Sequence, residues 1–426
     1  MSELTVKEFV DVVHRSKLIS KEKLIDVLSS GCRQSGGLPK RAEEVANFLL
    51  EEKLITSWQQ KNLLMGKSRG FFLGDYRLLS HLGTGGMSSV FLAQHMLIDR
   101  QVAIKILPAA NVNEGSFQQR FEQEARATSR LSHPNVVRVF DFDNQGDTQY
   151  MVLEYIAGRD LKVIIKEDGP LPLEKVAHYT AQVAAGLQHA HERGLVHRDI
   201  KPANLVVNDE DVVKVLDLGL ALVVNDDEQA SLTVVHSDNM MGTADYLSPE
   251  QARNAHMADA RSDIYSLGCT LYHLLAGHPP FTEGTMAERI SMHQNEKPKD
   301  VRAVREDCPH AIADVCMTML AKDPAKRFRS AGVVARRMHK WLQSNGKDVA
   351  TSTYASFGDE PVLTNLTSLR QTATPAAPIE ASDRSISKAR KSRSKKAVKT
   401  PLTLWITLGF LSLVVIGLLV ALLVRN

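Results

Sequence analysis

The spacing of apolar residues changes along the chain and predicts a small helical unit at its beginning. Within residues 1–70, apolar positions recur at intervals of three and four, as at Phe9 and Val12, which is the period of an amphipathic helix. Thr5 and Thr56 are each followed three residues later by Glu or Gln, a pattern typical of helix capping boxes. We expect a small all-α region of three or four short helices with a packing or docking role, because no motif here indicates chemistry.

A much longer apolar run occupies residues 402–424. These 23 residues carry no charge. At about 1.5 Å of rise per residue a helix of this length spans about 34 Å, against about 30 Å for the hydrocarbon core of a membrane. A buried core helix is the alternative, but core helices of this length usually keep a polar face. The run therefore predicts one transmembrane helix that anchors the chain in the cell membrane.

Basic residues before this run predict the orientation of the chain. Residues 384–399 contain eight Lys and Arg and no acidic residue. Positive charge stays on the cytoplasmic side, so we expect a single-pass protein with a C-terminal anchor and its larger N-terminal part in the cytoplasm. The beginning of the chain lacks a basic segment followed by an apolar one, and a cleaved signal peptide is not expected. The basic run also suits contact with anionic lipid headgroups.

Residues 343–400 are rich in Ser, Thr, Ala and Pro and show no sustained apolar period, which predicts a disordered linker with a basic juxtamembrane run. The net charge of the chain is +3, but this basic run alone is strongly positive, so the rest of the chain carries a net negative charge. No aromatic residue is interleaved with the charges of this run, so nucleic-acid binding is not expected. The four cysteines form no C-x-x-C pair, and neither a disulfide framework nor a zinc site is expected.

After residue 75 the pattern changes to short β-like runs separated by glycine, within a composition (43% hydrophobic, 24% charged) typical of globular proteins. Gly83 and Gly85 lie in a turn between two predicted strands, where backbone amides reach phosphates unhindered by side chains. A plain hairpin turn explains these glycines equally well.

Lys105 lies on an apolar strand, where a buried ammonium needs anionic partners such as phosphate oxygens and a carboxylate. Glu124, in a later helical run, is a candidate for that carboxylate.

A cluster of polar residues follows further along the chain. Asp199, Lys201 and Asn204 fall within the segment HRDIKPAN, and Asp217 opens the segment DLG after two apolar runs. A carboxylate can act as a general base, and carboxylate and amide oxygens are hard ligands of the kind that Mg²⁺ takes. These residues therefore predict a base beside a magnesium site.

The ordered motifs GTGGMSSV, VAIK, HRDIKPAN, DLG and SPE, spread from Gly83 to Glu250, resemble those of eukaryotic-like bacterial serine/threonine protein kinases. The resemblance implies an α+β, bilobal protein kinase fold over residues 74–342, with a small β-rich N-lobe and a larger α-helical C-lobe. It also implies transfer of the γ-phosphate of ATP to Ser or Thr hydroxyls of protein substrates, with ATP and Mg²⁺ bound. Two stretches of the first 70 residues, LISKEKL and LITSWQQKNLL, are similar to the N-terminal region of planctomycete-type bacterial kinases.

The resemblance also implies the roles of single residues. Asp199 matches the catalytic base and Lys201 the lysine near the γ-phosphate. Asn204 and Asp217 match the ligands of Mg²⁺. The positions that match the ATP-binding residues, with Leu153 as the gatekeeper beside them, are Leu82, Gly83, Gly85, Val90, Ala103, Lys105, Glu124, Glu154, Ile156 and Asp160.

Three residues depart from the pattern of the family: Ser88 replaces the third glycine of the loop, Leu218 the Phe of DFG, and Ser248 the Ala of APE. None of these positions carries charge, so the catalytic charges are all retained. Elsewhere the resemblance implies a buried ion pair between Glu250 and Arg327, and an Asp263 that supports the backbone of the catalytic loop.

The segment between Asp217 and Glu250 contains two candidates for regulatory phosphorylation, Ser237 and Thr233. A phosphate on either pairs with Arg198 and orders the loop, as in similar kinases. An ordinary solvated loop serine is an equally good interpretation of Ser237.

The leading hypothesis is therefore a membrane-anchored serine/threonine protein kinase that autophosphorylates its activation loop. A catalytically silent, nucleotide-binding scaffold (a pseudokinase) is the main alternative, and it is disfavoured because no charged residue of the motif set is missing. A small-molecule kinase on the same fold is also disfavoured, because the segment GTADYLSPEQ resembles parts that serve protein substrates. The sequence is compatible with homodimers formed by clustering in the membrane but does not decide the oligomeric state.

Overall fold

The computed structural model describes residues 4–34, 39–85, 88–107, 128–146, 148–218 and 244–346. The chain divides into two compact units, Met1–Asp359 and Glu360–Asn426, and every described residue belongs to the first. The predicted membrane anchor at 402–424, Glu124, Thr233 and Ser237 all lie outside the described residues. Within the described ranges, no helix is both long enough and apolar enough to cross a membrane.

Four helices occupy the region where the sequence predicts a small helical unit: α1 (Val6–Ser16), α2 (Lys21–Gln34), α3 (Ala42–Glu51) and α4 (Ser57–Leu64). Capping boxes begin α1 at Thr5 and α4 at Thr56, as the sequence predicts. The apolar faces of these helices meet in a core of their own, which also takes in Phe71 just beyond α4. The core residues with at most 1% of their surface exposed are Phe9, Val13, Val45, Ala46, Leu49, Leu63 and Phe71.

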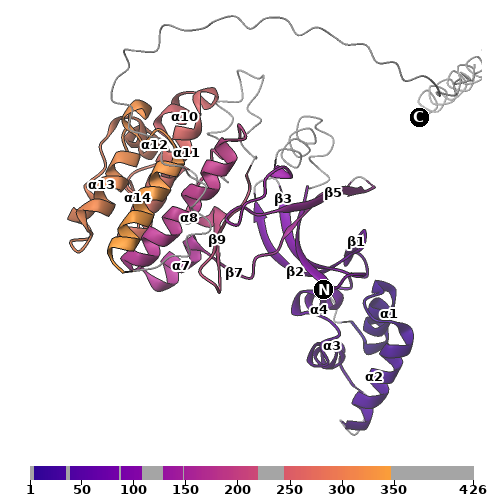
Figure 1. The fold of residues 1–426 in the computed structure, drawn as a ribbon. Helices are drawn as coiled ribbons and strands as arrows, with labels where there is room; N and C mark the ends of the chain where they lie inside the picture. Colours follow the sequence, from indigo (N-terminus) through magenta and orange to yellow (C-terminus); the bar gives the residue numbers. More distant parts are fainter. Residues whose placement is uncertain are drawn as a thin grey trace, which may run out of the picture. The chain divides into compact units, whose positions relative to one another are not determined.

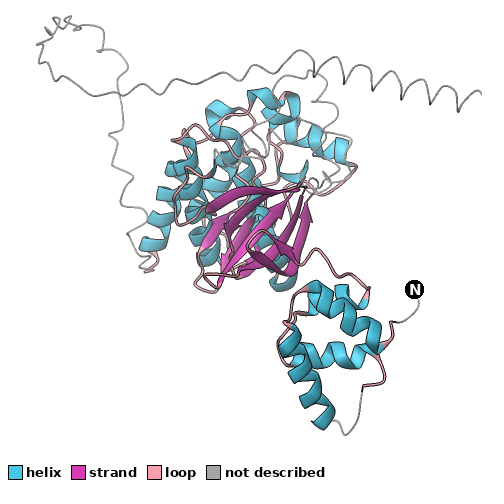
Figure 2. Ribbon diagram, turned by 90° about the vertical axis from the view of Figure 1, so that its right-hand side faces the viewer, coloured by secondary structure: helices cyan, strands magenta, loops and turns pink. Residues whose placement is uncertain are grey.

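The β-rich lobe that follows is one antiparallel sheet with the strand order β1-β2-β3-β4-β6-β5. Figure 2 shows its strands as a single twisted layer. One face of the sheet is closed by a cluster that includes Leu78, Ile104 and Tyr150. The strands are β1 (Phe72–Leu73), β2 (Tyr76–Gly85), β3 (Ser88–His95), β4 (Arg100–Ile106), β5 (Val139–Gln145) and β6 (Thr148–Glu154).

The larger lobe is mainly helical, and in Figure 1 its helices lie on the side away from β1 and β2. A small antiparallel sheet, β7 (Gly158–Asp160), β8 (Leu205–Asn208) and β9 (Val213–Val215), lies at its edge. The helices are α7 (Leu161–Asp168), α8 (Leu173–His191), α10 (Pro249–Arg253), α11 (Ala260–Ala276), α12 (Met286–Asn295), α13 (His310–Met319) and α14 (Ala331–Ser344). Short 3₁₀ turns lie at Pro202–Asn204, Ala244–Tyr246, Ala255–Met257, Val301–Ala303 and Pro324–Lys326.

Helix α11 is the centre of this lobe, because almost all of its residues are buried. It packs against α8, α13 and α14, and together they form one apolar core. A helix that is buried on all sides must satisfy its polar side chains internally. The polar residues at its beginning do so: Ser262 donates to Glu250, and Asp263 accepts hydrogen bonds from the catalytic loop.

Glu250 forms the buried ion pair with Arg327 that the resemblance implies. The two guanidinium nitrogens of Arg327 donate to the two carboxylate oxygens of Glu250 at 2.6 and 2.8 Å. Burial raises the pKa of Glu250, but Arg327 and the Ser262 hydroxyl together bring it below its ordinary value. The charged pair therefore links α10, which contains Glu250, to the segment before α14, which contains Arg327.

Candidate active site

The glycine-rich hairpin is formed by β2 and β3, which pair up to the turn. Gly83 lies opposite Val90, and Gly85 lies opposite Ser88. A Cβ atom on Gly83 would have no neighbour within 4 Å, so this backbone faces open space. Leu82 beside it is 47% exposed. The hairpin therefore presents bare backbone of the kind that approaches phosphates, and residues 86–87 lie outside the described residues.

Lys105 lies on β4, close to the carboxylate of Asp217. It lies opposite Val90 on β3 and Met151 on β6, and only 2% of its surface is exposed. Its Nζ donates to Asp217 Oδ1 at 2.8 Å. Burial raises the pKa of Asp217, but Lys105, with smaller contributions from His197 and Lys201, lowers it below its ordinary value. The Asp217 carboxylate is therefore held in its charged form beside the Lys105 ammonium.

Asp263 holds the backbone of the catalytic loop, as the resemblance implies. Its two carboxylate oxygens accept the backbone N–H groups of His197 at 2.8 Å and Arg198 at 2.7 Å. His191 Nε2 donates to the same carboxylate at 2.7 Å. These contacts hold Arg198 at a φ of 65°, a left-handed conformation rare for a residue with a side chain. Burial raises the pKa of Asp263, and the hydrogen bond from His191 is the first of the contacts that lower it below its ordinary value.

The loop places three predicted site residues in one hydrogen-bonded group. Lys201 Nζ lies 2.8 Å from Asp199 Oδ2, and Asn204 Nδ2 donates to the same oxygen at 3.0 Å. Asn204 Nδ2 also donates to the backbone carbonyl of Asp199 at 2.8 Å. Asp199 Oδ1 is buried and has no hydrogen-bond partner among the described residues. One oxygen of Asp199 is thus held in place while the other is left to accept a proton donor.

Two of the positions that match ATP-binding residues, Glu154 and Asp160, use their side chains for structural contacts. Glu154, at the end of β6, accepts from Lys214 on β9 at 2.8 and 2.9 Å, which ties the two lobes together. Asp160 Oδ1 accepts the backbone N–H of Val163 at 2.8 Å and so caps α7. The resemblance places Asp160 near the ribose and does not include this cap, although an Asp directly before a helical run is a recognisable signal for one.

Ala103 and Ile156 are the two apolar ATP-site positions that lie on β4 and directly after β6. Ala103 is 8% exposed and sits opposite Leu153 in the register of β4 and β6. Ile156 is half-buried and follows the end of β6. Both are therefore placed where an apolar surface beside the adenine is expected.

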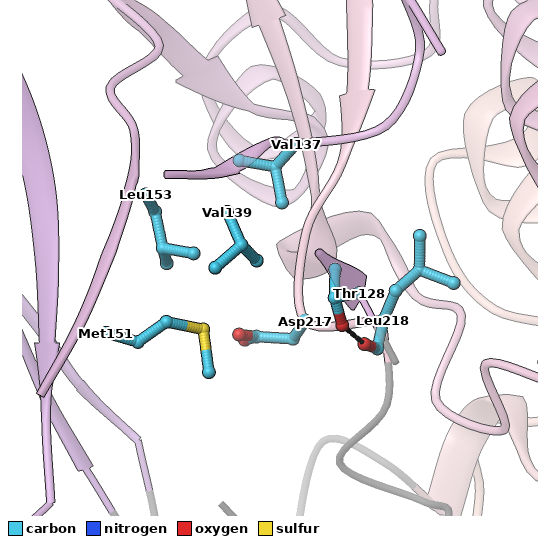
Figure 3. Close-up of a pocket in the computed structure, with 7 residues that line it drawn as sticks. All are labelled: Thr128, Val137, Val139, Met151, Leu153, Asp217 and Leu218. Carbon is cyan, nitrogen blue, oxygen red and sulfur yellow. Dashed lines mark hydrogen bonds between the residues drawn. The ribbon is translucent and has the colours of Figure 1, made fainter. Parts of the chain in front are cut away.

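A small pocket lies behind Leu153, and Figure 3 shows it closed mainly by apolar side chains. The carboxylate of Asp217 points into it from one side, toward Met151, and Thr128 donates a hydrogen bond to the backbone carbonyl of Leu218. Its other lining residues are Val137, Val139 and Leu153. Sequence reasoning identified Leu153, Asp217 and Leu218 but missed the rest, whose only signal is their apolar or small character.

The oxygens left by these contacts suit a magnesium ion. Asn204 uses its amide nitrogen toward Asp199, which leaves Oδ1 for a cation, and Asp217 uses Oδ1 toward Lys105. Mg²⁺ is usually held by one or two protein oxygens together with phosphates and water. No group of three or more His, Cys, Asp or Glu side chains that would form an all-protein metal cage occurs in the described part of the chain. The donor set therefore fits a metal that arrives with a nucleotide.

The family model for the protein kinase domain matches residues 76–342. The chain belongs to the protein kinase family. Members of this family use ATP as a substrate and Mg²⁺ as a cofactor. The match covers both lobes of the fold described above, from the first residue of β2 into α14.

The kinase domain is similar to bacterial serine/threonine kinases. A probable serine/threonine-protein kinase of Corynebacterium efficiens is 39% identical over 300 residues, which cover 68% of this chain and 45% of the relative. Serine/threonine-protein kinase PrkC of Bacillus subtilis is 37% identical over 270 residues, which cover 63% of this chain and 40% of the relative. The chain thus spans less than half the length of these relatives.

A solved structure supports the same fold. The crystal structure of a double mutant of the Mycobacterium tuberculosis PknI kinase domain matches with a TM-score of 0.50 and 28% sequence identity. The match covers 64% of this chain and 97% of that domain. The resemblance to a bilobal kinase fold therefore extends from the motifs to the three-dimensional structure.

Proposed function

We propose that this protein is a serine/threonine protein kinase that transfers the γ-phosphate of ATP to Ser or Thr hydroxyls of proteins. The observation that carries the proposal is the state of the Asp199 carboxylate. Its Oδ2 is held by Lys201 and Asn204, while its Oδ1 is buried with no hydrogen-bond partner among the described residues. A buried acceptor of this kind is costly unless a donor such as a substrate hydroxyl arrives.

Each residue of the site has a separate role in such a transfer. A bond forms between the substrate oxygen and the γ-phosphorus, the bond to the leaving oxygen of ADP breaks, and the hydroxyl proton passes to Asp199 Oδ1. Lys105 binds the α- and β-phosphates, and Lys201 binds the γ-phosphate while it orients Asp199. Asn204 and Asp217 would hold Mg²⁺, which would neutralise phosphate charge.

A labelling experiment tests this function. The full-length chain is incubated with γ-labelled ATP, Mg²⁺ and a mixture of Ser- and Thr-containing peptides. We expect incorporation on Ser or Thr, and a rate about 10²–10³-fold lower in Lys105→Met, because a preorganised charge facing the phosphates is lost. Lys166→Met, which removes an exposed lysine of α7, is the matched control and should keep the wild-type rate. A wild-type chain that binds nucleotide but incorporates no label would instead support a scaffold.

We further propose that residues 402–424 anchor the protein in the cell membrane with the kinase domain in the cytoplasm, and that clustering there promotes autophosphorylation of Ser237 or Thr233 between two copies. The length of the uncharged run and the basic residues before it support the anchor. The full chain should stay with membranes after alkaline washing, and deletion of 402–424 should release it. A deletion variant that stays bound as tightly as the full chain would contradict the anchor.

A further inference from the structure

We propose that helix α4 of the N-terminal region positions the glycine-rich hairpin, with Thr56 and Gln59 as the positioning residues. The helical region would then set the affinity of the kinase domain for its nucleotide without touching the nucleotide. This inference rests on the proposed function, because the hairpin is taken to cover the phosphates of ATP. Figure 1 shows α4 beside β2, the first strand of that hairpin, and the two elements are in contact.

The contact is made at an irregularity of β2. The register between β2 and β3 shifts between Leu78 and Ser80, so Leu79 is an extra residue in the strand. Two side chains at the beginning of α4 reach this bulge. Gln59 Nε2 donates to the carbonyl of Leu78 at 2.7 Å, and Thr56 Oγ1 donates to the carbonyl of Leu79. Gln59 is only 2% exposed, so water does not replace its hydrogen bond readily.

The same two residues form the capping box of α4. The backbone N–H of Thr56 donates to Gln59 Oε1 at 2.9 Å, and the backbone N–H of Gln59 donates to Thr56 Oγ1 at 3.2 Å. Each side chain therefore accepts a hydrogen bond from the helix and donates one to the strand. The first turn of α4 and the bulge of β2 are thus held by shared atoms, and one does not shift without breaking the contacts of the other.

A chain of ring contacts continues from α4 toward the tip of the hairpin. Trp58 packs edge-on against Phe91 of β3, with the ring centroids 5.6 Å apart. Phe91 packs edge-on against His81 at 5.0 Å, and His81 Nε2 lies 3.1 Å from the hydroxyl of Thr84. Thr84 pairs with Ser89 one residue before the described end of β2. A series of contacts therefore leads from α4 through Phe91 and His81 to Thr84 near the described end of β2.

This arrangement predicts an effect on binding more than on chemistry. In the proposed function, Gly83 of the hairpin and Lys105, which lies opposite Val90, are next to the phosphates of the nucleotide. Asp199 and Asn204 are held by contacts within the catalytic loop and with Lys201, far along the chain from α4. Loosening α4 should therefore raise the KM for ATP and leave kcat nearly unchanged. A merely structural role would instead lower thermal stability without separating the two constants.

The decisive variant is Gln59→Glu in the full-length chain. Glutamate keeps the capping box, since its carboxylate still accepts from Thr56, but it can no longer donate to Leu78 and faces that carbonyl with negative charge. We expect the KM for ATP and the dissociation constant of a fluorescent ADP analogue to rise about three- to tenfold, the worth of one hydrogen bond. Gln60→Glu makes the same chemical change at the half-buried neighbour, whose amide donates to Asn47 of α3 and not to β2, and should leave both constants unchanged.

The outcomes separate the inference from the function on which it rests. An unchanged KM and an unchanged dissociation constant in folded Gln59→Glu would overturn the positioning role while the wild-type activity stands. A wild-type chain that neither binds the analogue nor incorporates phosphate would remove the proposed function itself. If Gln59→Glu does not fold, Thr56→Ala and Thr56→Ser provide the same comparison. Serine keeps the hydroxyl donor and should restore the wild-type KM, and a KM that is equal in the two variants would overturn the inference.

Discussion

Asp199→Asn should lower kcat for phosphate transfer about 10²–10⁴-fold, the range that general base catalysis supplies. Asparagine is nearly the same size as aspartate, and its carbonyl oxygen still accepts from Lys201 and Asn204, which hold Asp199 Oδ2. What the variant loses is the oxygen proposed to take the proton, because an amide nitrogen that donates stands in its place. Rates of label transfer at saturating ATP measure the effect.

Nucleotide binding should be preserved in this variant. The residues proposed to bind the phosphates, Lys105 above all, keep their contacts, so the dissociation constant for an ADP analogue should stay within about twofold of the wild-type value. Asp209→Asn is the matched control, since Asp209 is exposed and lies in the turn after β8. A variant with full transfer activity would show that Asp199 is not the base.

Arg327→Met should reduce the free energy of unfolding by about 3–5 kcal/mol, the usual cost of leaving a buried charge without its partner. The variant removes two hydrogen bonds to Glu250 and leaves that carboxylate with Ser262 as its remaining side-chain donor. It also removes the donor to the backbone carbonyl of Ala321 at 2.7 Å. The midpoint of urea unfolding, followed by circular dichroism of the full chain, measures the loss.

An exposed ion pair provides the comparison for this variant. Arg302 and Asp300 are joined at 2.7 Å, but their side chains are 35% and 40% exposed. Arg302→Met should therefore cost at most about 1 kcal/mol. If both variants shift the unfolding midpoint equally, burial of the Glu250 pair is not what makes it stabilising.

Local features of the site were predictable because the residues that make them are neighbours in the sequence. The capping boxes at Thr5 and Thr56 form as their spacing predicts, since each needs only a hydroxyl and a residue three positions later. The contacts among Asp199, Lys201 and Asn204 also lie within one short segment. For such groups, the order of the amino acids already implies the geometry.

Contacts between distant segments were predictable only where the family resemblance supplied them. The pair of Glu250 and Arg327 and the support of the catalytic loop by Asp263 came from that source, and both are present. One partner of Lys105 is Asp217, 112 residues further along the chain. The sequence showed that a buried ammonium needs an anion, but only the meeting of the two lobes selects this carboxylate.

The amino-acid sequence by itself determined which charged groups gather at the candidate site, because motifs preserve residue type and order. The tertiary structure decided what the remaining polar groups do. It uses Glu154 to join the lobes through Lys214 and turns Thr56 and Gln59 toward a bulge in β2. Those assignments depend on which surfaces pack together, and packing is a property of the whole fold and not of any segment of the chain.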